Sequence, residues 1–266
     1  MVLMASHSAG SPPGKPRPEI TRRLCLAADI EQYSRFDTPH QEAVQAQLDR
    51  VLRAAAERSG LDHSEWSTQP QGDLEFAVLP AGTPEQLVLG EYVTHLAAEL
   101  GGYNATRRPV GRMRLRLAID VGVAVTAALG FSGPAPIAVA RYLDAPEVKQ
   151  ALAATGSASL AVVVSDRLYQ DVVRSRFHGL DPEQYRRIHV RQKGFAGYGW
   201  LRLPGAHPQD AAEPSPGASE DGPRSPARAA EREQSSFVQH GVHGTAIQGV
   251  IHGSVVYRAI HGEAGR

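Results

Sequence analysis

Asp29 and Asp73 are the residues whose type and spacing could support chemistry in this chain. Asp29 follows the apolar run 24–28, which is typical of a buried strand, and a buried carboxylate is costly unless it is paired or holds a metal. Asp73 lies at the tight turn of a hairpin predicted over residues 66–79. If that hairpin pairs beside the first strand, the two carboxylates meet at one end of the sheet and repel each other unless a cation lies between them.

Paired carboxylates of this kind predict a site for Mg²⁺ or Mn²⁺, because these ions prefer oxygen ligands. With two ions, such a site would stabilise the attacking and leaving oxygens at a phosphorus atom. In the alternative interpretation, Asp29 caps the following turn and Asp73 is an ordinary turn residue. The residues by themselves leave both interpretations open.

The elements that must position this pair follow from hydrophobic periodicity and turn residues. We expect strands at 23–30, twice within 66–79, and at 113–125, 160–164, 185–190 and 199–203. Helices are expected at 38–59, 83–100 (ended by Gly101 and Gly102), 137–143, 146–153 and 166–173. The strand at 113–125 alternates and should have one solvent-facing side. This order predicts an α+β fold with helices on one side of a mostly antiparallel sheet.

Composition limits the partners, the disulfide content and the cellular location that can be expected of this protein. The 266 residues carry 28 Lys+Arg and 28 Asp+Glu, which gives no reason to expect nucleic-acid or membrane partners. Cys25 is the single cysteine, so no internal disulfide can form and a reducing cytoplasm is the expected location. No stretch approaches the roughly 20 apolar residues of a membrane span, and the first residues are too short an apolar run for a signal peptide.

Composition also divides the chain. Residues 1–20 are rich in Ser, Gly and Pro and are expected to be a disordered lead. The globular domain is expected at 21–204, a flexible linker at 205–234, and a tail of different composition at 235–266.

Four segments, taken in order, resemble the class III nucleotide (adenylate/guanylate) cyclases of the actinobacterial type. They are residues 28–34, Gly72 with Asp73, residues 117–122 and residues 190–195, and the resemblance covers about 22–203. It implies a ferredoxin-like cyclase fold whose active sites lie between two head-to-tail protomers. It also implies attack of a ribose 3′-hydroxyl on the α-phosphate of a nucleoside triphosphate, which gives a cyclic nucleotide and pyrophosphate.

The resemblance assigns roles to individual residues. Asp29 and Asp73 match the metal-binding aspartates of the family, and Ile30 falls where the family uses a main-chain carbonyl as a ligand. Arg141 matches the arginine that steadies the phosphates in the transition state, and Lys193 matches a phosphate-binding lysine.

Three positions depart from the family pattern. The base-reading positions hold Gln69 (or a neighbour) and Gly130 (or Phe131), and Ile137 replaces the asparagine that positions the ribose. The chain is therefore either a cyclase with unusual base choice or a catalytically degenerate module for nucleotide binding or protein association. The sequence leaves the two open.

The remaining notable charged and aromatic residues are expected to have structural roles. Asp120 is expected to be an exposed strand residue or a turn former. The basic stripe is expected to be a solvated strand face, with nucleic-acid contact as the alternative; it comprises Arg107, Arg108, Arg112, Arg114 and Arg116. Trp66 and Trp200 are expected in or near the core.

The tail contains a nine-residue repeat, in which residues 242–248 align with 251–257 and a third copy begins at Ile260. Stacked copies could bury the β-branched residues that one copy cannot. The tail resembles the RHIM-like amyloid-signalling motifs at the ends of bacterial immune effectors, which implies a partner with a matching tail. The alternatives are an inert tail and a zinc site formed by His240, His243, His252 and His261.

Overall fold

A computed structural model describes residues 21–192 and 194–206 of the chain. Seven strands form one sheet in the order β2-β3-β1-β4-β7-β9-β8, and β5 and β6 form a separate hairpin. The strands are β1 (Arg22–Ile30), β2 (Ser67–Gln71), β3 (Leu74–Val78), β4 (Leu115–Val123), β5 (Val125–Ala127), β6 (Gly130–Ser132), β7 (Leu160–Ser165), β8 (Arg186–Gln192) and β9 (Phe195–Arg202). Within the large sheet only β4 and β7 pair in parallel, so the predicted α+β class with a mostly antiparallel sheet is confirmed.

The helices connect these strands. The α-helices are α1 (Thr38–Arg58), α2 (Glu85–Leu87), α3 (Val93–Ala105), α4 (Pro134–Leu143), α5 (Pro146–Ala154) and α6 (Asp166–Leu168). Two π-helical turns, η3 (Val88–Tyr92) and η5 (Tyr169–Val173), continue α2 and α6. Short 3₁₀ turns are η1 (Tyr33–Arg35), η2 (His63–Glu65), η4 (Pro109–Gly111), η6 (Phe177–Gly179) and η7 (Pro182–Gln184). Within residues 21–192 and 194–206, every helix is too short or too polar to cross a membrane.

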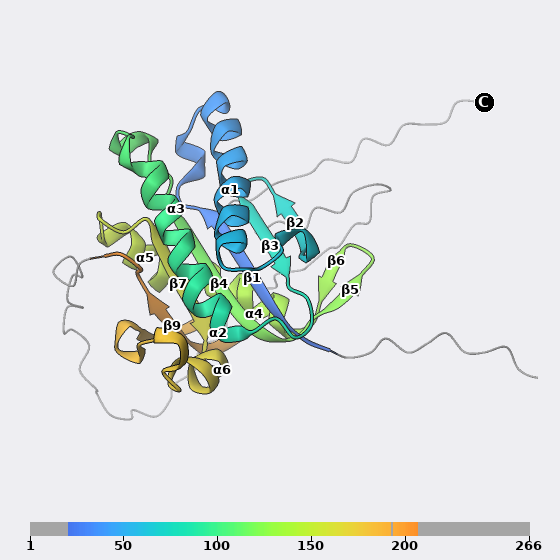
Figure 1. Cartoon of the computed structure of the whole chain (residues 1–266). Coiled ribbons are helices and arrows are strands. Elements are labelled where there is room, and N and C mark those ends of the chain that lie inside the picture. Colours follow the sequence, from blue (N-terminus) through green and yellow to red (C-terminus); the bar gives the residue numbers. More distant parts are fainter. Residues whose placement is uncertain (1–20, 193, 207–266) are drawn as a thin grey trace, which may run out of the picture.

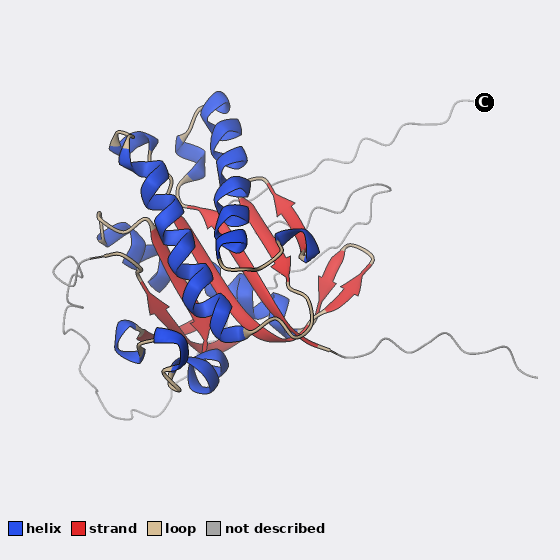
Figure 2. Ribbon diagram, viewed as in Figure 1, coloured by secondary structure: helices blue, strands red, loops and turns tan. Residues whose placement is uncertain are grey.

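Helices cover both faces of the sheet, so the expectation of helices on one side is wrong. Figures 1 and 2 show α1 and α3 in front of the strands and α4 behind them. Leu24 and Leu26 of β1 pack into the core beneath α1 and α3, whereas Cys25 and Ala27 pack into a second core with α4 and α5. Alternate residues of a strand point to opposite faces, so the continuous apolar run of β1 needs a covering layer on each side.

Helix boundaries differ from the expected ones where side chains make specific contacts. Thr38, expected to be the cap of α1, is its first residue; the cap is Asp37, whose carboxylate accepts a hydrogen bond from the backbone N–H of His40 at 3.0 Å. α3 continues through Gly101 and Gly102 to Ala105. Its last turn is held by Asn104, whose buried amide exchanges hydrogen bonds with the backbone of Met113 at 2.8 and 2.9 Å. This tertiary contact outweighs the glycine stop signal.

The predicted strand at 113–125 is divided in the structure. β4 ends at Val123, and the chain then forms the β5–β6 hairpin, which projects from the body in Figure 1. Gly133 returns the chain to α4 with φ 125°, and a Cβ there would lie 2.4 Å from the carbonyl oxygen of Val123. That junction therefore requires glycine for its backbone angle and for its close approach to the strand.

Replacing Gly133 by alanine is expected to lower the free energy of unfolding by about 3 kcal/mol, because the methyl group clashes with backbone and the angle is strained. Gly111→Ala is the matched control, since a Cβ at Gly111 meets nothing within 4 Å. Its effect should stay within about 0.5 kcal/mol. Urea denaturation measures both, and equal midpoints for the two variants would contradict the assignment of Gly133.

Candidate functional site

A cavity of about 370 Å³ lies at the carboxyl end of β1. Its lining comes from β1, the turn after it, the β2–β3 hairpin, β4 and the end of α4. The residues are Asp29, Ile30, Gln32, Tyr33, Ser34, Gln71, Asp73, Leu74, Arg116, Ala140, Leu143 and Asp144. Asp29, Ile30 and Asp73, three of the residues predicted from sequence, thus line one cavity.

The antiparallel pairing of β1 with β3 brings these three residues together. Asp29 is paired with Leu74, and the backbone N–H of Ile30 donates to the carbonyl oxygen of Asp73 at 3.0 Å. Gly72 forms the tight turn of the hairpin with φ 68°. The hairpin therefore delivers Asp73 to the strand end at which Asp29 lies. That these residues bind metal remains a prediction.

Arg116 holds Asp29 on the adjacent strand. Its Nε and Nη2 donate to the two carboxylate oxygens of Asp29 at 2.8 and 2.5 Å, and both residues are 8% exposed. Arg114 is also largely covered; it pairs with Glu31 at 3.1 Å and donates to the carbonyl oxygen of Ala158 at 2.9 Å. The expected solvated face is therefore wrong at Arg114 and Arg116.

Some charges around the cavity raise the pKa of Asp29 and others lower it. Burial is the largest influence and raises the pKa of Asp29, as does the negative charge of Asp73, whereas Arg116 and Lys149 lower it; the net result is a pKa of about 7. Lys149 forms an ion pair with Asp144, which also lines the cavity. A proton and a metal ion would therefore compete for Asp29, and a rise in pH through this range favours the ion.

The carboxylate oxygens at this cavity suit Mg²⁺ or Mn²⁺, but they are too few to fill the coordination shell of either ion. Two carboxylates at one cavity are hard oxygen donors, and Mg²⁺ commonly takes one or two carboxylates plus waters and phosphate oxygens. Within the described ranges, no three His, Cys, Asp or Glu side chains converge to hold an ion. An ion at Asp29 would either use the lone pairs that Arg116 leaves free or displace Arg116, and water or a bound phosphate must supply the remaining ligands.

Arg141, one of the two predicted phosphate-binding residues, does not line this cavity. Arg141 lies on α4, but the α4 side chains at the cavity are those of Ala140 and Leu143. The Nε atom of Arg141 is buried and has no hydrogen-bond partner in the part of the chain that the structure describes. Lys193 lies outside the described residues.

Two of the three positions that depart from the family pattern, Gln69 and Gly130, lie against each other. A Cβ on Gly130 would lie 2.5 Å from Oε1 of Gln69, so the Gln69 side chain packs directly against the Gly130 backbone. Phe131 contacts Phe76 with ring centroids 5.7 Å apart, which fixes the β5–β6 hairpin against β3. Ile137 is 54% exposed on α4.

Asp120 is buried, so the expectation of an exposed residue is wrong. It is 5% exposed and paired with Cys25 across β1 and β4, away from the cavity. Its carboxylate accepts a hydrogen bond from the N–H of Val121 at 2.8 Å, and burial raises its pKa. Burial, with the Asp120 charge, raises the pKa of Cys25 to about 12, so this thiol is unreactive near neutral pH. Trp66, at 7% exposed, lies in the core as expected.

Sequence reasoning missed Arg116, Asp144 and Lys149 as members of this site. The alternation of β4 placed Arg116 on a definite face of that strand, but it gave no sign of which carboxylate the arginine would meet. Asp144 and Lys149 flank the start of α5, five residues apart, and nothing in their local sequence relates them to β1. Only the packing of α4 and α5 behind the sheet brings them near Asp29.

No protein-family model matches the sequence, and a search of curated proteins finds no significant match. Several solved structures are similar to it. One is titled adenylate/guanylate cyclase/hydrolase from Silicibacter pomeroyi (19% identity over 70% of this chain and 99% of that chain, TM-score 0.49). Another is the guanylyl cyclase Cya2 (11% identity, 73% and 98%, TM-score 0.49). A third is the guanylate cyclase domain of RhGC from Catenaria anguillulae in complex with GTP (16% identity, 69% and 97%, TM-score 0.43). At these identities and TM-scores the likeness assigns no activity to this chain, so the argument for function rests on the cavity.

Proposed function

We propose that this chain is a nucleotide cyclase-like effector that binds a nucleoside triphosphate with Mg²⁺ or Mn²⁺ and converts it to a cyclic nucleotide and pyrophosphate. One observation carries the proposal: Asp29, Asp73 and the guanidinium of Arg116 line the same cavity at a strand end. The four sequence segments that resemble class III cyclases support it. Opposite charges held at one polar cavity suit a ligand that combines cations with phosphates.

Each lining residue has a distinct task in this mechanism. Asp29 and Asp73 hold the ions, which supply positive charge at the attacking and leaving oxygens when bound. Arg116, whose planar fork matches phosphate oxygens in geometry, would contact the phosphates of the bound nucleotide at the same strand end. Leu74 and Leu143 contribute apolar walls that limit the access of water.

The site is completed by a second protomer in this proposal. Arg141 is not part of the lining of its own cavity, and the resemblance implies that the family arginine and Lys193 act across a head-to-tail dimer. We therefore expect the residues of one cavity to come from two chains. Two equivalent sites would then exist per homodimer.

Mixing two inactive variants tests this arrangement. Asp73→Asn and Arg141→Ala should each be inactive alone, because every site contains one lesion. An equimolar mixture should recover about a quarter of wild-type activity, since half of the dimers are mixed and each has one intact site. The measurement is cyclic nucleotide formed per chain after the subunits have exchanged. A mixture as inactive as its components, with exchange demonstrated, would mean that Arg141 serves the site of its own chain, whereas an active Arg141→Ala variant would place it outside catalysis.

The decisive experiment for the function is incubation of the full chain with each of the four nucleoside triphosphates and Mn²⁺, followed by mass spectrometry. Cyclic monophosphate and pyrophosphate should form in equal amounts, and a chelator should abolish both. The identity of the product names the base that the Gln69 and Gly130 region accepts.

A catalytically silent module is the second candidate. Arg116 occupies both oxygens of Asp29, and Ile137 places an exposed apolar side chain where the family has a ribose-positioning asparagine. Calorimetric binding of a nucleoside triphosphate without product would favour this candidate. If the chain instead forms cyclic product, Ile137→Asn, which restores the family residue, should raise the rate of product formation.

We further propose that the repeat at 235–266, which lies outside the described residues, recruits or assembles the domain through amyloid-like stacking with a partner tail. A peptide covering residues 236–262 should form fibrils with the ~4.7 Å strand spacing of stacked chains in fibre diffraction. The variant Ile251→Asp should block assembly because it places a charge in a stacked apolar column, whereas Ser254→Asp adds the same charge outside that column. Persistent monomer in a seeded wild-type peptide would argue for an inert tail.

A further inference from the structure

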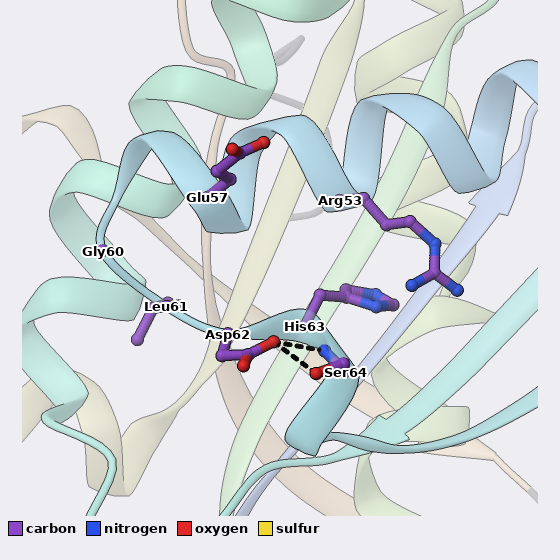
Figure 3. Close-up of a pocket in the computed structure, with 7 residues that line it drawn as sticks. All are labelled: Arg53, Glu57, Gly60, Leu61, Asp62, His63 and Ser64. Carbon is purple, nitrogen blue, oxygen red and sulfur yellow. Dashed lines mark hydrogen bonds between the residues drawn. The ribbon is translucent and has the colours of Figure 1, made fainter.

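A second cavity, of about 440 Å³, opens at the carboxyl end of α1 and shares no residue with the Asp29 cavity. In Figure 3, Arg53 and Glu57 extend from α1, and the chain that follows the helix supplies the remaining lining. The residues are Arg53, Glu57, Gly60, Leu61, Asp62, His63 and Ser64. Nothing in the proposed nucleotide chemistry uses them.

His63 is the feature of this cavity that requires an explanation. Its side chain is only 5% exposed, its ring lies against Trp66 with centroids 4.6 Å apart, and its Nε2 is 3.1 Å from a carboxylate oxygen of Glu75. The carboxylate assigns the proton to Nε2, which leaves Nδ1 as a hydrogen-bond acceptor. Nδ1 is buried and has no partner among the residues described. A buried acceptor without a donor is costly, so a ligand that donates to it would be stabilised there.

The charges around His63 favour a cation. Asp62 accepts hydrogen bonds from the backbone N–H and the hydroxyl of Ser64 at 2.8 and 2.6 Å, which lower its pKa and keep it ionised. Glu57 adds a second carboxylate, and the carboxyl end of the 21-residue helix α1 adds partial negative charge. The opposing charge of Arg53 is already engaged, since its Nε is 2.7 Å from Asp49.

We propose that this cavity binds a small organic cation that carries N–H groups, a primary ammonium or a guanidinium. One N–H donates to Nδ1 of His63, the carboxylates of Glu57 and Asp62 balance the charge, and Leu61 packs against the alkyl chain of the ligand. Entry requires Arg53 to turn outward, which its side chain can do because it and its ion-pair partner Asp49 are each 52% exposed.

The test uses putrescine as the probe and tetramethylammonium as the comparison, because the second ion has a positive charge but no N–H. The full chain is titrated without nucleotide, by calorimetry and by long-range ¹H–¹⁵N spectra of the histidine rings. We expect putrescine to bind and to shift the Nδ1 resonance of His63, and tetramethylammonium to do neither. Because no nucleotide is present, this result stands or fails separately from the cyclase proposal.

Variants identify the acceptor. His63→Gln retains an amide that can donate to Glu75 but lacks Nδ1, and it should weaken putrescine binding about tenfold, as loss of one hydrogen bond to a charged group does. Glu57→Gln, on the exposed surface of α1, should weaken it similarly without a risk to folding. His95→Gln, on α3 and outside the cavity, should leave binding unchanged. Equal binding of both cations, no binding of putrescine, or full affinity in both cavity variants would overturn the proposal.

Discussion

Replacing Asp29 by asparagine is expected to reduce formation of cyclic nucleotide by about a thousandfold or to below detection. Asparagine preserves the size of the side chain but removes the charge that an ion would use at the cavity. Asp73→Asn should cause a loss of the same order, because the two carboxylates line one cavity and would share the ions. The measurement is the rate of cyclic product with saturating Mn²⁺.

Circular dichroism at the assay temperature must show that each variant is folded, because Asp29→Asn also leaves Arg116 buried without its counter-charge. Asp171→Asn changes an exposed carboxylate on η5 that is not part of the cavity lining, and it should retain full activity. Loss of Asp29 or Asp73 with no change in rate would show that the measured activity arises elsewhere. A loss that excess Mn²⁺ reverses would instead indicate weakened ion binding with the remaining groups intact.

The placement of Asp29 and Asp73 was accessible from sequence because it depends on local signals. A continuous apolar run ended at Asp29, and Gly72 marked a tight turn, which the structure shows with φ 68°. Those two signals also gave the strand and hairpin, and antiparallel pairing of neighbours then brought Asp73 to Ile30. Short-range patterns therefore fixed the carboxylate half of the candidate site.

The basic half of the site depends on pairing between distant segments. Arg116 is 87 residues from Asp29 in sequence, and only the register of β1 with β4 makes them neighbours. The alternation predicted over 113–125 indicated a solvent-facing side that included Arg114. Instead Arg114 lies just before β4 and donates to the carbonyl oxygens of Thr155 and Ala158, just beyond α5. Carbonyls at a helix end need donors, and this need buried a charged residue that periodicity assigned to solvent.

The same limitation explains the errors at Asp120 and at the end of α3. Asp120 is buried because α4 covers the second face of the sheet. The local sequence pattern of β4 does not predict this covering helix. α3 passes through Gly101 and Gly102 because Asn104 hydrogen-bonds to Met113 nine residues later. In both places a tertiary contact outweighs a local signal of about 1 kcal/mol or less.

Removing Asp29 alone from its ion pair with Arg116 should destabilise the protein more than removing both partners. Asp29→Asn is expected to lower the free energy of unfolding by about 3–5 kcal/mol, because the guanidinium is left buried without its counter-charge and cannot lose its proton. Arg116→Met should cost less near pH 6. Burial already raises the pKa of Asp29 to about 7, and loss of Arg116 removes an influence that lowers it, so the carboxyl can become neutral.

The double variant Asp29→Asn/Arg116→Met distinguishes this account from simple loss of packing. It leaves no buried charge at either position, so its unfolding free energy should lie above that of Asp29→Asn alone and the cycle should show a coupling of about 2 kcal/mol or more. The exposed pair of Arg53 and Asp49 is the control cycle and should give a coupling below about 1 kcal/mol. Urea denaturation at pH 6 and pH 8 supplies the values. Additive losses at Asp29 and Arg116 would mean that the two side chains do not depend on each other, and the guanidinium would then be free to bind phosphate without any exchange at Asp29.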